Sequence, residues 1–232
     1  MKLHRFYVSD IELVGDLVID DKKYTHQWTK VLRFRVGREV SLFNNQGLEY
    51  KYKITMIDKF GVRLQRLQQI DSVVTNREVY LCFSLLKKDK NDWVLQKATE
   101  LGVSHFMPLL CERTEKTGFD EERARKIVIE AAEQCGRTDI PVILEPTYPE
   151  KATEKLDGTV ELFIAEQGSP NSTFKFSAQT QSVAILIGPE GGWTDQEKHL
   201  FHEKKLKHMA LSKFTLRAET AAITAAAVIA GV

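Results

Sequence analysis

Residues 187–193, with the sequence IGPEGGW, form a glycine-rich segment after the apolar run 183–187 and before a helix signal at 194–197. This order of strand, tight loop and helix is where open α/β folds bind small ligands. The loop lacks the two common nucleotide fingerprints, G-x-G-x-x-G and G-x-x-x-x-G-K-S/T. It also carries Glu190 where a phosphate cradle needs bare N–H groups and positive charge. We therefore expect a cationic or neutral ligand, and S-adenosylmethionine, with its sulfonium, is one of several that fit.

A second segment, residues 211–222 (LSKFTLRAETAA), joins the last expected strand to the last expected helix. It supplies Arg217 and Glu219, and the acid falls in the first helical turn, where it suits the positive end of the dipole. Taken alone, the segment has a salt-bridged helix start as its alternative. The carboxyl ends of parallel strands meet at one sheet edge, however, so the two loops are expected to converge there. Their convergence favours a ligand site.

The first 70 residues have the pattern of a small β-barrel, because short runs alternate apolar and polar residues around turn signals. A short helix is expected at 26–33. The expected strands lie at 5–8, 39–43, 48–54 and 62–67.

From about residue 77 the pattern changes to alternating strands and helices, which predicts a parallel sheet with helices on both faces. Thr194 and Glu197 form a capping box for one of the helices. The expected strands lie at 79–85, 105–110, 161–165, 183–187 and 209–211, and the expected helices at 89–101, 121–135, 194–204 and 219–231. A boundary near 72–76 divides the chain into domains 1–72 and 73–232.

The last expected helix, 219–231, is rich in alanine and apolar all round. Such a helix is buried, either in the core or against a second subunit. The sequence leaves both arrangements open.

Composition excludes several classes of protein. With 232 residues and 43% hydrophobic residues, the chain is expected to fold around a core, and no run approaches the ~20 apolar residues of a membrane span. The first six residues lack an apolar signal core, so we expect a cytoplasmic protein.

Metal binding is not expected. The three cysteines, Cys82, Cys111 and Cys135, lie far apart, form no zinc framework, and are interpreted as buried free thiols. The histidines at 199, 202 and 208 follow no ligand spacing and are expected at the surface.

The net charge is +1, but it is unevenly distributed. Residues 1–75 hold 13 Lys+Arg and 9 Asp+Glu, a balance of +4, and the remainder holds 20 and 23, a balance of −3. The basic first third is suited to phosphate contacts, although a solvated face is the alternative.

The segments IGPEGGWTDQE and LSKFTLRAETAA together closely resemble the 16S ribosomal RNA (uracil-N3) methyltransferases, the RsmE family of the SPOUT superfamily. The resemblance extends over nearly the whole chain. Further matching segments are 5–8, 26–33 with Gly37, 97–103 and 130–137.

The resemblance implies an N-terminal PUA-like RNA-binding barrel, a C-terminal α/β domain with a deep trefoil knot, and a homodimer whose site lies where the subunits meet. It also implies S-adenosylmethionine bound by the knot loops. Ser212 stands where family members often have glycine, which adds a side chain near the expected adenine pocket. The cofactor-binding residues it implies are Ala165, Ile187, Gly188, Glu190, Gly191, Gly192, Leu211, Ser212, Leu216 and Thr220.

The implied reaction is an in-line methyl transfer from sulfonium to N3 of a uracil in 16S rRNA of the small ribosomal subunit. Arg217 is the candidate for stabilising the charge that develops on the uracil carbonyls. Glu219 is a candidate base or orienting group, and its alternatives are a helix-start acid or a partner for Arg217. N3 lies on the pairing edge, so the target uridine must be unpaired or splayed out.

Five arginines are candidates for RNA contacts. Arg33, Arg35 and Arg38 lie close enough in sequence to form one patch, with solvated surface as the alternative. Arg5 and Arg137 fall in matched segments. The run 87–90 is expected to be either a loop flanking the substrate groove or a solvated turn.

Three other functions compete with this one. They are a methyltransferase of the same fold acting on transfer RNA, a ribosome-assembly factor that binds RNA without catalysis, and a nicotinamide-dependent enzyme. The PUA-like first domain argues against the first, the two intact loops against the second, and Glu190 with the missing fingerprint against the third.

Overall fold

The structure, a computed structural model, describes residues 3–9, 11–44, 46–71, 77–87, 89–115, 118–156, 158, 160–166 and 180–231. These residues form two compact units. The first holds the described residues of Met1–Val74 together with Ala132–Ile140, and the second holds those of Thr75–Ala131 and Pro141–Val232. The boundary expected near 72–76 lies outside the described residues. We expected residues 73–232 to form one domain, but residues 132–140 belong with the first unit.

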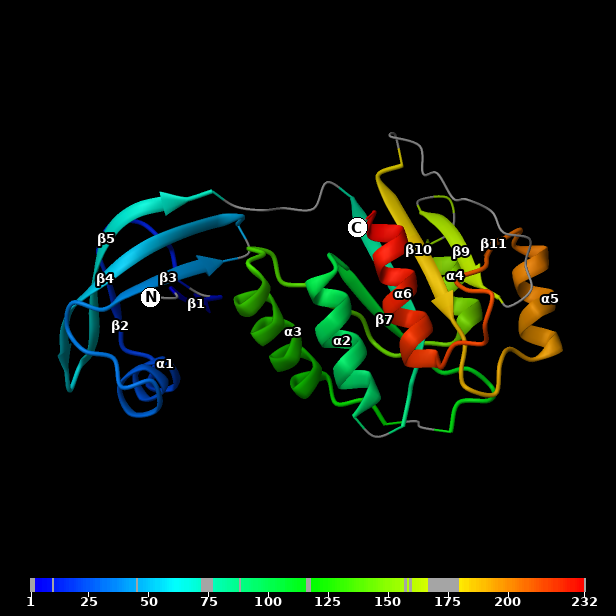
Figure 1. Ribbon diagram of the computed structural model, residues 1–232, viewed down its shortest axis with the longest axis horizontal. Coiled ribbons are helices and arrows are strands. Elements are labelled where there is room, and N and C mark those ends of the chain that lie inside the picture. Colours follow the sequence, from blue (N-terminus) through cyan, green and yellow to red (C-terminus); the bar gives the residue numbers. More distant parts are fainter. Residues whose placement is uncertain are drawn as a thin grey trace. The chain divides into compact units, whose positions relative to one another are not determined.

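The first unit is built on a mostly antiparallel sheet of the expected short strands (Figure 1). Only β1 and β3 pair in parallel. In sheet order the strands are β1 (His4–Tyr7), β3 (Glu39–Asn44), β4 (Leu48–Asp58), β5 (Gly61–Ile70) and β2 (Leu17–Ile19). Strand β2 was not expected from the sequence, because three residues are too few to show an alternation of apolar and polar side chains.

The helix expected at 26–33 differs from the observed one. The chain forms α1 (Lys22–His26) and then a π-helical turn, η1 (Gln27–Val31), closed by a 2.8 Å bond from Leu32 N to the Gln27 carbonyl. The π-helical turn directs the Trp28 side chain into the core. Trp28 is fully buried there, and its ring centroid lies 5.0 Å from that of Phe6. This indole is the largest side chain of the unit's core.

Arg5 joins residues 132–140 to the first unit. Its guanidinium forms a bidentate pair with Glu49 and donates to the carbonyls of Ala132, Glu133 and Arg137 at 2.9–3.2 Å. The Glu133 carboxylate in turn accepts from Tyr7 N at 2.9 Å. Buried polar groups need such partners, so these bonds explain why the chain returns to this unit 127 residues after Arg5.

The second unit is the expected α/β domain with a fully parallel sheet. In sheet order the strands are β11 (Lys207–Met209), β9 (Glu161–Ala165), β10 (Ser182–Ile187), β6 (Glu78–Ser84), β7 (His105–Leu109) and β8 (Val142–Ile143). The helices are α2 (Lys90–Glu100), α3 (Glu121–Cys135), α4 (Pro149–Leu156), α5 (Asp195–Glu203) and α6 (Ala218–Ala230). The last turn of α3 is the part that belongs to the first unit.

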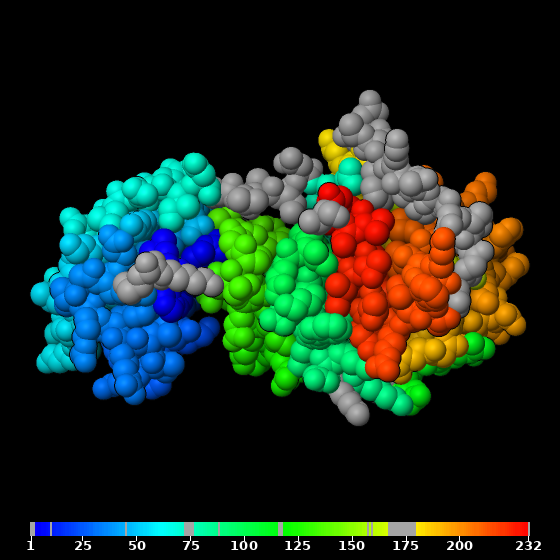
Figure 2. Space-filling model, viewed as in Figure 1, coloured from blue at the N-terminus to red at the C-terminus, as the bar shows by residue number. Residues whose placement is uncertain are grey.

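Two layers of helices cover this sheet. Ala152 and Leu156 of α4 and Phe201 of α5 pack with Ala184 and Leu186 of β10 on one face. On the other face α6 packs beside α2 and over β6 and β10 (Figures 1 and 2). The sequence analysis missed the two-residue β8 and the eight-residue α4, and placed β11 two residues too late.

The small residues of α6 serve packing within the chain. Ala222, Ala225, Ala226 and Ile229 are fully buried, and only Val228 among the large side chains of this helix is exposed. Among the described residues, no helix is long and apolar enough to cross a membrane.

Two of the three cysteines are buried thiols, as expected. Burial raises the pKa of both Cys82 and Cys111 to about 12, which keeps them protonated and unreactive. Cys135 is exposed, contrary to expectation, because it ends α3.

Candidate functional site

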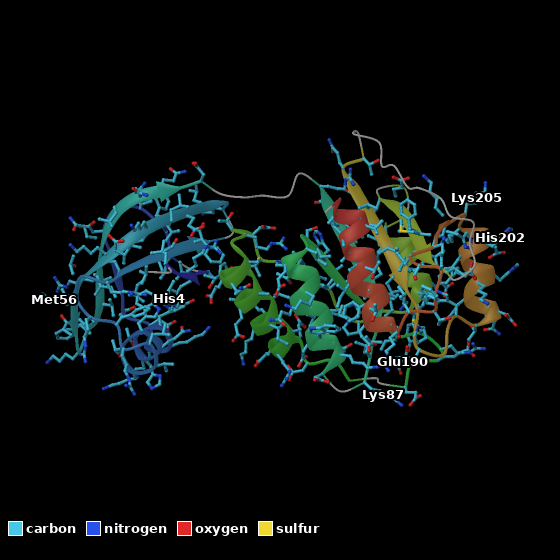
Figure 3. The ribbon with its side chains drawn as sticks, in the orientation of Figure 1. His4, Met56, Lys87, Glu190, His202 and Lys205 are labelled. Atoms are coloured by element: carbon cyan, nitrogen blue, oxygen red, sulfur yellow. The ribbon has the colours of Figure 1, made fainter. Side chains whose placement is uncertain are left out.

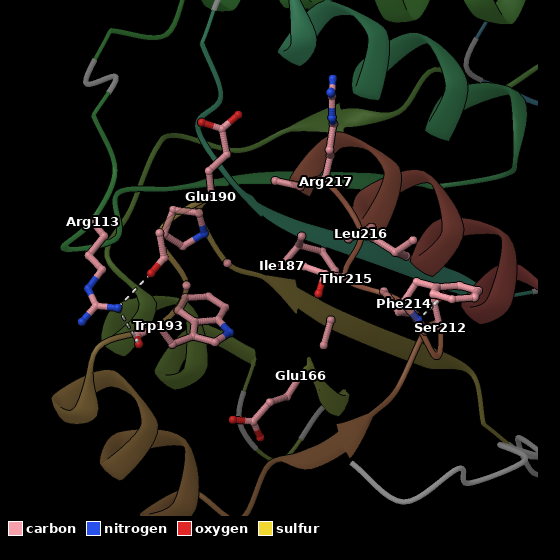
Figure 4. A pocket seen from close by; sticks show the side chains of 18 of the residues that line it. Arg113, Glu166, Ile187, Glu190, Trp193, Ser212, Phe214, Thr215, Leu216 and Arg217 are labelled. Atoms are coloured by element: carbon pink, nitrogen blue, oxygen red, sulfur yellow. Dashed lines mark hydrogen bonds between the residues drawn. The ribbon is translucent and has the colours of Figure 1, made fainter. Parts of the chain in front are cut away.

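A cavity of about 690 Å³ lies at the carboxyl edge of the sheet, beyond the ends of β9, β10 and β11 (Figure 4). This is the edge at which parallel sheets bind ligands. It is lined by Lys90, Arg113, Ala165, Glu166, Ile187, Gly188, Pro189, Glu190, Gly191, Gly192, Trp193, Lys198, Leu211, Ser212, Phe214, Thr215, Leu216, Arg217, Ala218 and Ala221. The two loops singled out in the sequence therefore converge on one cavity.

The structure brings all but one of the expected cofactor residues to this cavity. Thr220 is the exception: it is exposed and does not line the space, although Ala218 and Ala221 of the same helix do. Arg217 lines the cavity, whereas Glu219, expected as a catalytic group, is buried and does not. Glu219 is thus poorly placed to touch a ligand.

The glycine loop is shaped around Trp193. A Cβ added at Gly188 would lie 2.9 Å from the Trp193 ring, closer than real Cβ contacts. The indole is itself fixed, because it is 6% exposed and its ring centroid lies 4.8 Å from that of Phe201. Gly192 has a φ of +70°, which favours glycine, and its N–H closes the turn on the Pro189 carbonyl at 2.9 Å.

Gly188→Ala is expected to displace the indole or the loop. Overpacking of this kind costs about 1–3 kcal/mol of folding free energy, and the distorted loop should bind a ligand at least tenfold more weakly. Calorimetric titration with S-adenosylmethionine, beside thermal unfolding, measures both. Adding Trp193→Phe should recover part of each loss by removing the atoms that clash.

Gly118→Ala is the matched control, because a Cβ there would meet nothing within 4 Å and its φ is not in the left-handed region. It should leave affinity and stability unchanged. Wild-type affinity in Gly188→Ala would contradict the role given to this contact.

Arg113 and Glu197 hold the glycine loop in place, and the sequence analysis assigned a ligand-site role to neither. The Arg113 guanidinium donates to the carbonyl of Gly191 at 2.8 Å. The Glu197 carboxylate accepts from Thr194 N at 2.8 Å in the expected capping box, and also from Glu112 N at 3.1 Å. Arg113 and Glu112 belong to a loop some 80 residues away, so no local pattern reveals their two bonds.

The second loop is stabilised by Ser212. Its Oγ accepts a 3.0 Å hydrogen bond from Phe214 N, so the Ser212 side chain is used by its own loop (Figure 4). Phe214 also lines the cavity and is 79% exposed. An aromatic ring this exposed at a cavity edge is available to stack on a base or to meet another chain.

One end of the cavity carries opposite charges. Glu190 and Arg217 both point toward it, with Glu166 at the opposite end (Figure 4). The Arg217 side chain is exposed and makes no hydrogen bond or salt bridge with any described residue. Its guanidinium is therefore available to a ligand.

Lys90 is a site residue that the sequence analysis left as part of a loop or a solvated turn. It is the first residue of α2, its Nζ pairs with the Glu190 carboxylate, and it lies 3.3 Å from Glu219 Oε2. The hydrogen bond from Lys90 lowers the pKa of Glu190, and the same bond raises the pKa of Lys90. The charge of Glu190 is thus already paired, which weakens its use as evidence for a cationic ligand. Lys88 lies outside the described residues.

The five arginines expected to bind RNA separate into two groups. An open concavity of about 400 Å³ in the first unit is lined by His4, Leu32, Arg33, Phe34, Arg35, Val36 and Arg38. It contains three of the five, with the Arg38 guanidinium 5.2 Å from the Phe34 ring centroid. Arg33 and Arg35 are exposed.

Arg5 and Arg137 do not belong to this surface. All five N–H groups of the Arg5 guanidinium are already engaged, so none is left for a phosphate. The Arg137 side chain is 7% exposed and pairs with Asp139. Both arginines are structural, which corrects their assignment as RNA ligands.

No metal site is found among the described residues, where no group of three or more His, Cys, Asp or Glu side chains is arranged to hold an ion. His199 lies 3.4 Å from Glu203, and His208 lies 2.7 Å from Glu166.

Two protein families match the chain in the order in which the units occur. Residues 29–65 match an RNA methyltransferase PUA domain, and residues 74–230 match an RNA methyltransferase domain. The ribosomal RNA small subunit methyltransferase E of Rickettsia conorii is 30% identical, over 98% of this chain and 95% of that protein. The protein of the same name from Aquifex aeolicus is 27% identical, over 96% of both.

Solved structures agree over the whole length. The ribosomal RNA small subunit methyltransferase E of Neisseria gonorrhoeae, bound to S-adenosyl methionine, has a TM-score of 0.87 at 27% identity, covering 98% of this chain and 97% of that one. A putative methyltransferase of Legionella pneumophila, in complex with bound SAM, has a TM-score of 0.86 at 28% identity, covering 100% and 98%. Since both domain families match and a relative at 30% identity covers 98% of its length, the chain belongs to the ribosomal RNA small subunit methyltransferase E family.

Proposed function

We propose that the protein transfers a methyl group from S-adenosylmethionine to N3 of a specific uridine in the 16S rRNA of the small ribosomal subunit. The observation that carries this proposal is the convergence of the loops 187–193 and 211–217 on one cavity. Relatives that match nearly the whole chain are named for ribosomal RNA small subunit methylation, and two similar structures contain SAM.

The cavity fits the proposed cofactor. Its volume of about 690 Å³ lies within the usual range for small-molecule sites. Gly188, Gly191 and Gly192 let backbone approach a ligand closely, and Ile187, Leu211 and Leu216 offer apolar surface to an adenine. When bound, the cofactor supplies an electrophilic methyl group on a sulfonium that leaves readily.

Arg217 would act on the acceptor base. Loss of the N3 proton to water places negative charge on the two flanking carbonyls of uracil, and an unpaired guanidinium stabilises such charge. Glu219 is given no proton-transfer role, since it is buried outside the cavity and paired with Lys90.

The concavity around Arg33, Arg35 and Arg38 would contact the RNA. Arg33 and Arg35 are exposed, and exposed guanidinium groups bind phosphates. A modest positive balance of +4 in residues 1–75, from 13 basic and 9 acidic residues, supports the same surface.

The proposal includes three further properties implied by the family resemblance. They are a trefoil knot in the second unit, a homodimer, and a location in the cytoplasm, where ribosomal subunits are assembled. Phe214 at 79% and Trp93 at 49% exposure are large apolar side chains that a second subunit would cover. Sedimentation equilibrium tests the dimer directly.

Methyl transfer from labelled S-adenosylmethionine tests the function. The acceptors are small ribosomal subunits lacking the modification, naked 16S RNA and bulk transfer RNA, and the modified base is then mapped. Label at N3 of one uridine in 16S rRNA is the expected result. Label in transfer RNA would show that the substrate is transfer RNA and not 16S rRNA. If the protein bound RNA but neither bound the cofactor nor transferred label, it would be a non-catalytic assembly factor.

A further inference from the structure

One ammonium group joins the glycine loop to the first turn of α6. Lys90 Nζ pairs with Glu190, which belongs to the glycine loop, and lies 3.3 Å from Oε2 of Glu219, in the first turn of α6. Lys90 itself comes from a third element, the start of α2. Figure 3 shows Glu190 beyond the end of β10.

The two ion pairs differ in burial. The Glu219 side chain is 8% exposed, and among the described residues its Oε2 has no hydrogen-bond partner, so the Lys90 ammonium is its counter-charge. A buried carboxylate left without a counter-charge is strongly destabilising. Glu190 is 46% exposed, and a pair in water contributes little stability by itself. The buried Glu219 carboxylate thus holds the Lys90 ammonium in place. From this position the ammonium pairs with the exposed Glu190 carboxylate.

This arrangement gives the outer pair a use other than stability. Glu190 sits between Pro189 and Gly191, in a loop whose backbone lines the cavity. Glycines allow such a loop several conformations, and an ion pair to a fixed lysine selects one of them. Binding to a preselected conformation avoids the entropy cost of ordering the loop.

We propose that Lys90 is a positioning residue: held by Glu219, it fixes Glu190 and the glycine loop in the conformation that binds the cofactor. The identity of that cofactor rests on the proposed function. Neither acid nor lysine serves as a base here. The hydrogen bond with Glu190 raises the pKa of Lys90, so the ammonium persists near neutral pH, and Glu190 stays charged beside it.

Calorimetric titration with S-adenosylmethionine, beside single-turnover methylation at saturating cofactor, tests this role. Lys90→Met should raise Kd about tenfold and leave the single-turnover rate within about threefold, because the loop is misplaced only before binding. Glu190→Gln should raise Kd similarly, and the double variant should be no worse than either single one. Lys90→Arg, which keeps the charge, should recover most of the affinity.

A second variant separates positioning from stability. Lys90→Met leaves Glu219 uncompensated, so the protein is expected to lose stability; Lys90→Met/Glu219→Gln removes the buried charge and should restore the unfolding temperature without restoring affinity. The control is Lys97→Met on the same helix, where the lysine lies 2.9 Å from Glu100 and does not line the cavity. It should change neither affinity nor rate.

Hydrogen exchange on the cofactor-free protein provides a readout that does not depend on the proposed function. Amides of 188–193 should exchange faster in Lys90→Met/Glu219→Gln than in wild type, while β10 stays protected. Unchanged exchange would overturn the inference. An unchanged Kd with a slower single-turnover rate would also overturn it, by placing Lys90 on the acceptor base. If wild type binds no S-adenosylmethionine but exchange rises as stated, the proposed function fails and the positioning role stands.

Discussion

Arg217→Ala is expected to lower the rate of methyl transfer by about 10²–10³-fold, the usual effect of removing one group that stabilises developing charge. Its guanidinium lines the cavity, is exposed, and makes no hydrogen bond or salt bridge with any described residue, so its removal costs the fold little. Affinity for S-adenosylmethionine should stay within about threefold, because truncating an uncommitted surface side chain changes little else. Single-turnover rates and calorimetry measure the two effects separately.

Two variants sharpen this test. Arg217→Lys keeps the charge but loses the planar fork, so its rate should fall between those of wild type and Arg217→Ala. Lys213→Ala removes an exposed cation from the same loop that does not line the cavity, and its rate should equal that of wild type. A full rate in Arg217→Ala would remove this residue from the reaction.

Arg5→Met is expected to destabilise the first unit by about 3–5 kcal/mol, the usual effect of breaking a buried ion pair. The Arg5 and Glu49 side chains are only 14% and 4% exposed, so the carboxylate left behind would be buried without a counter-charge. Chemical denaturation followed by circular dichroism measures the loss. Arg5→Met/Glu49→Met should recover much of it, because no charge then remains buried.

Arg123→Met is the matched comparison. Arg123 pairs with Asp92 at 2.6 Å but its side chain is 65% exposed, so the change should leave the denaturation midpoint nearly unchanged. The RNA affinity of Arg5→Met tests the alternative, that Arg5 binds a phosphate. If it were a phosphate ligand, Arg5→Met would fold normally and reduce the salt dependence of RNA affinity instead.

Local patterns were sufficient for the elements that build the ligand site. The apolar run before the glycine loop is β10, and the expected capping box at Thr194 and Glu197 starts α5 with both of its bonds present. Such features depend on residues within a few positions of each other. The convergence of the two loops follows in turn from the parallel sheet.

Contacts between distant segments could not be predicted in the same way. Lys90 is paired with a residue 100 positions away, and the carbonyls that Arg5 holds begin 127 positions away. The sequence does not distinguish an arginine whose donors are all engaged within the fold from an arginine that is available to RNA. The difference lies in which backbone carbonyls the fold brings near the guanidinium. The partner of Glu219 could not be predicted for the same reason, since its lysine comes from the start of α2.

The bonds that Arg5 makes to 132–140 also affect the order in which the chain folds during synthesis. Domains usually form as soon as their residues leave the ribosome, N-terminal part first. Here the first 74 residues emerge without the carbonyls that Arg5 needs, and these follow only with residues 132–140. The first domain therefore reaches its complete form only after more than half of the 232-residue chain has been translated, and a fragment ending at residue 74 would lack part of its own structure.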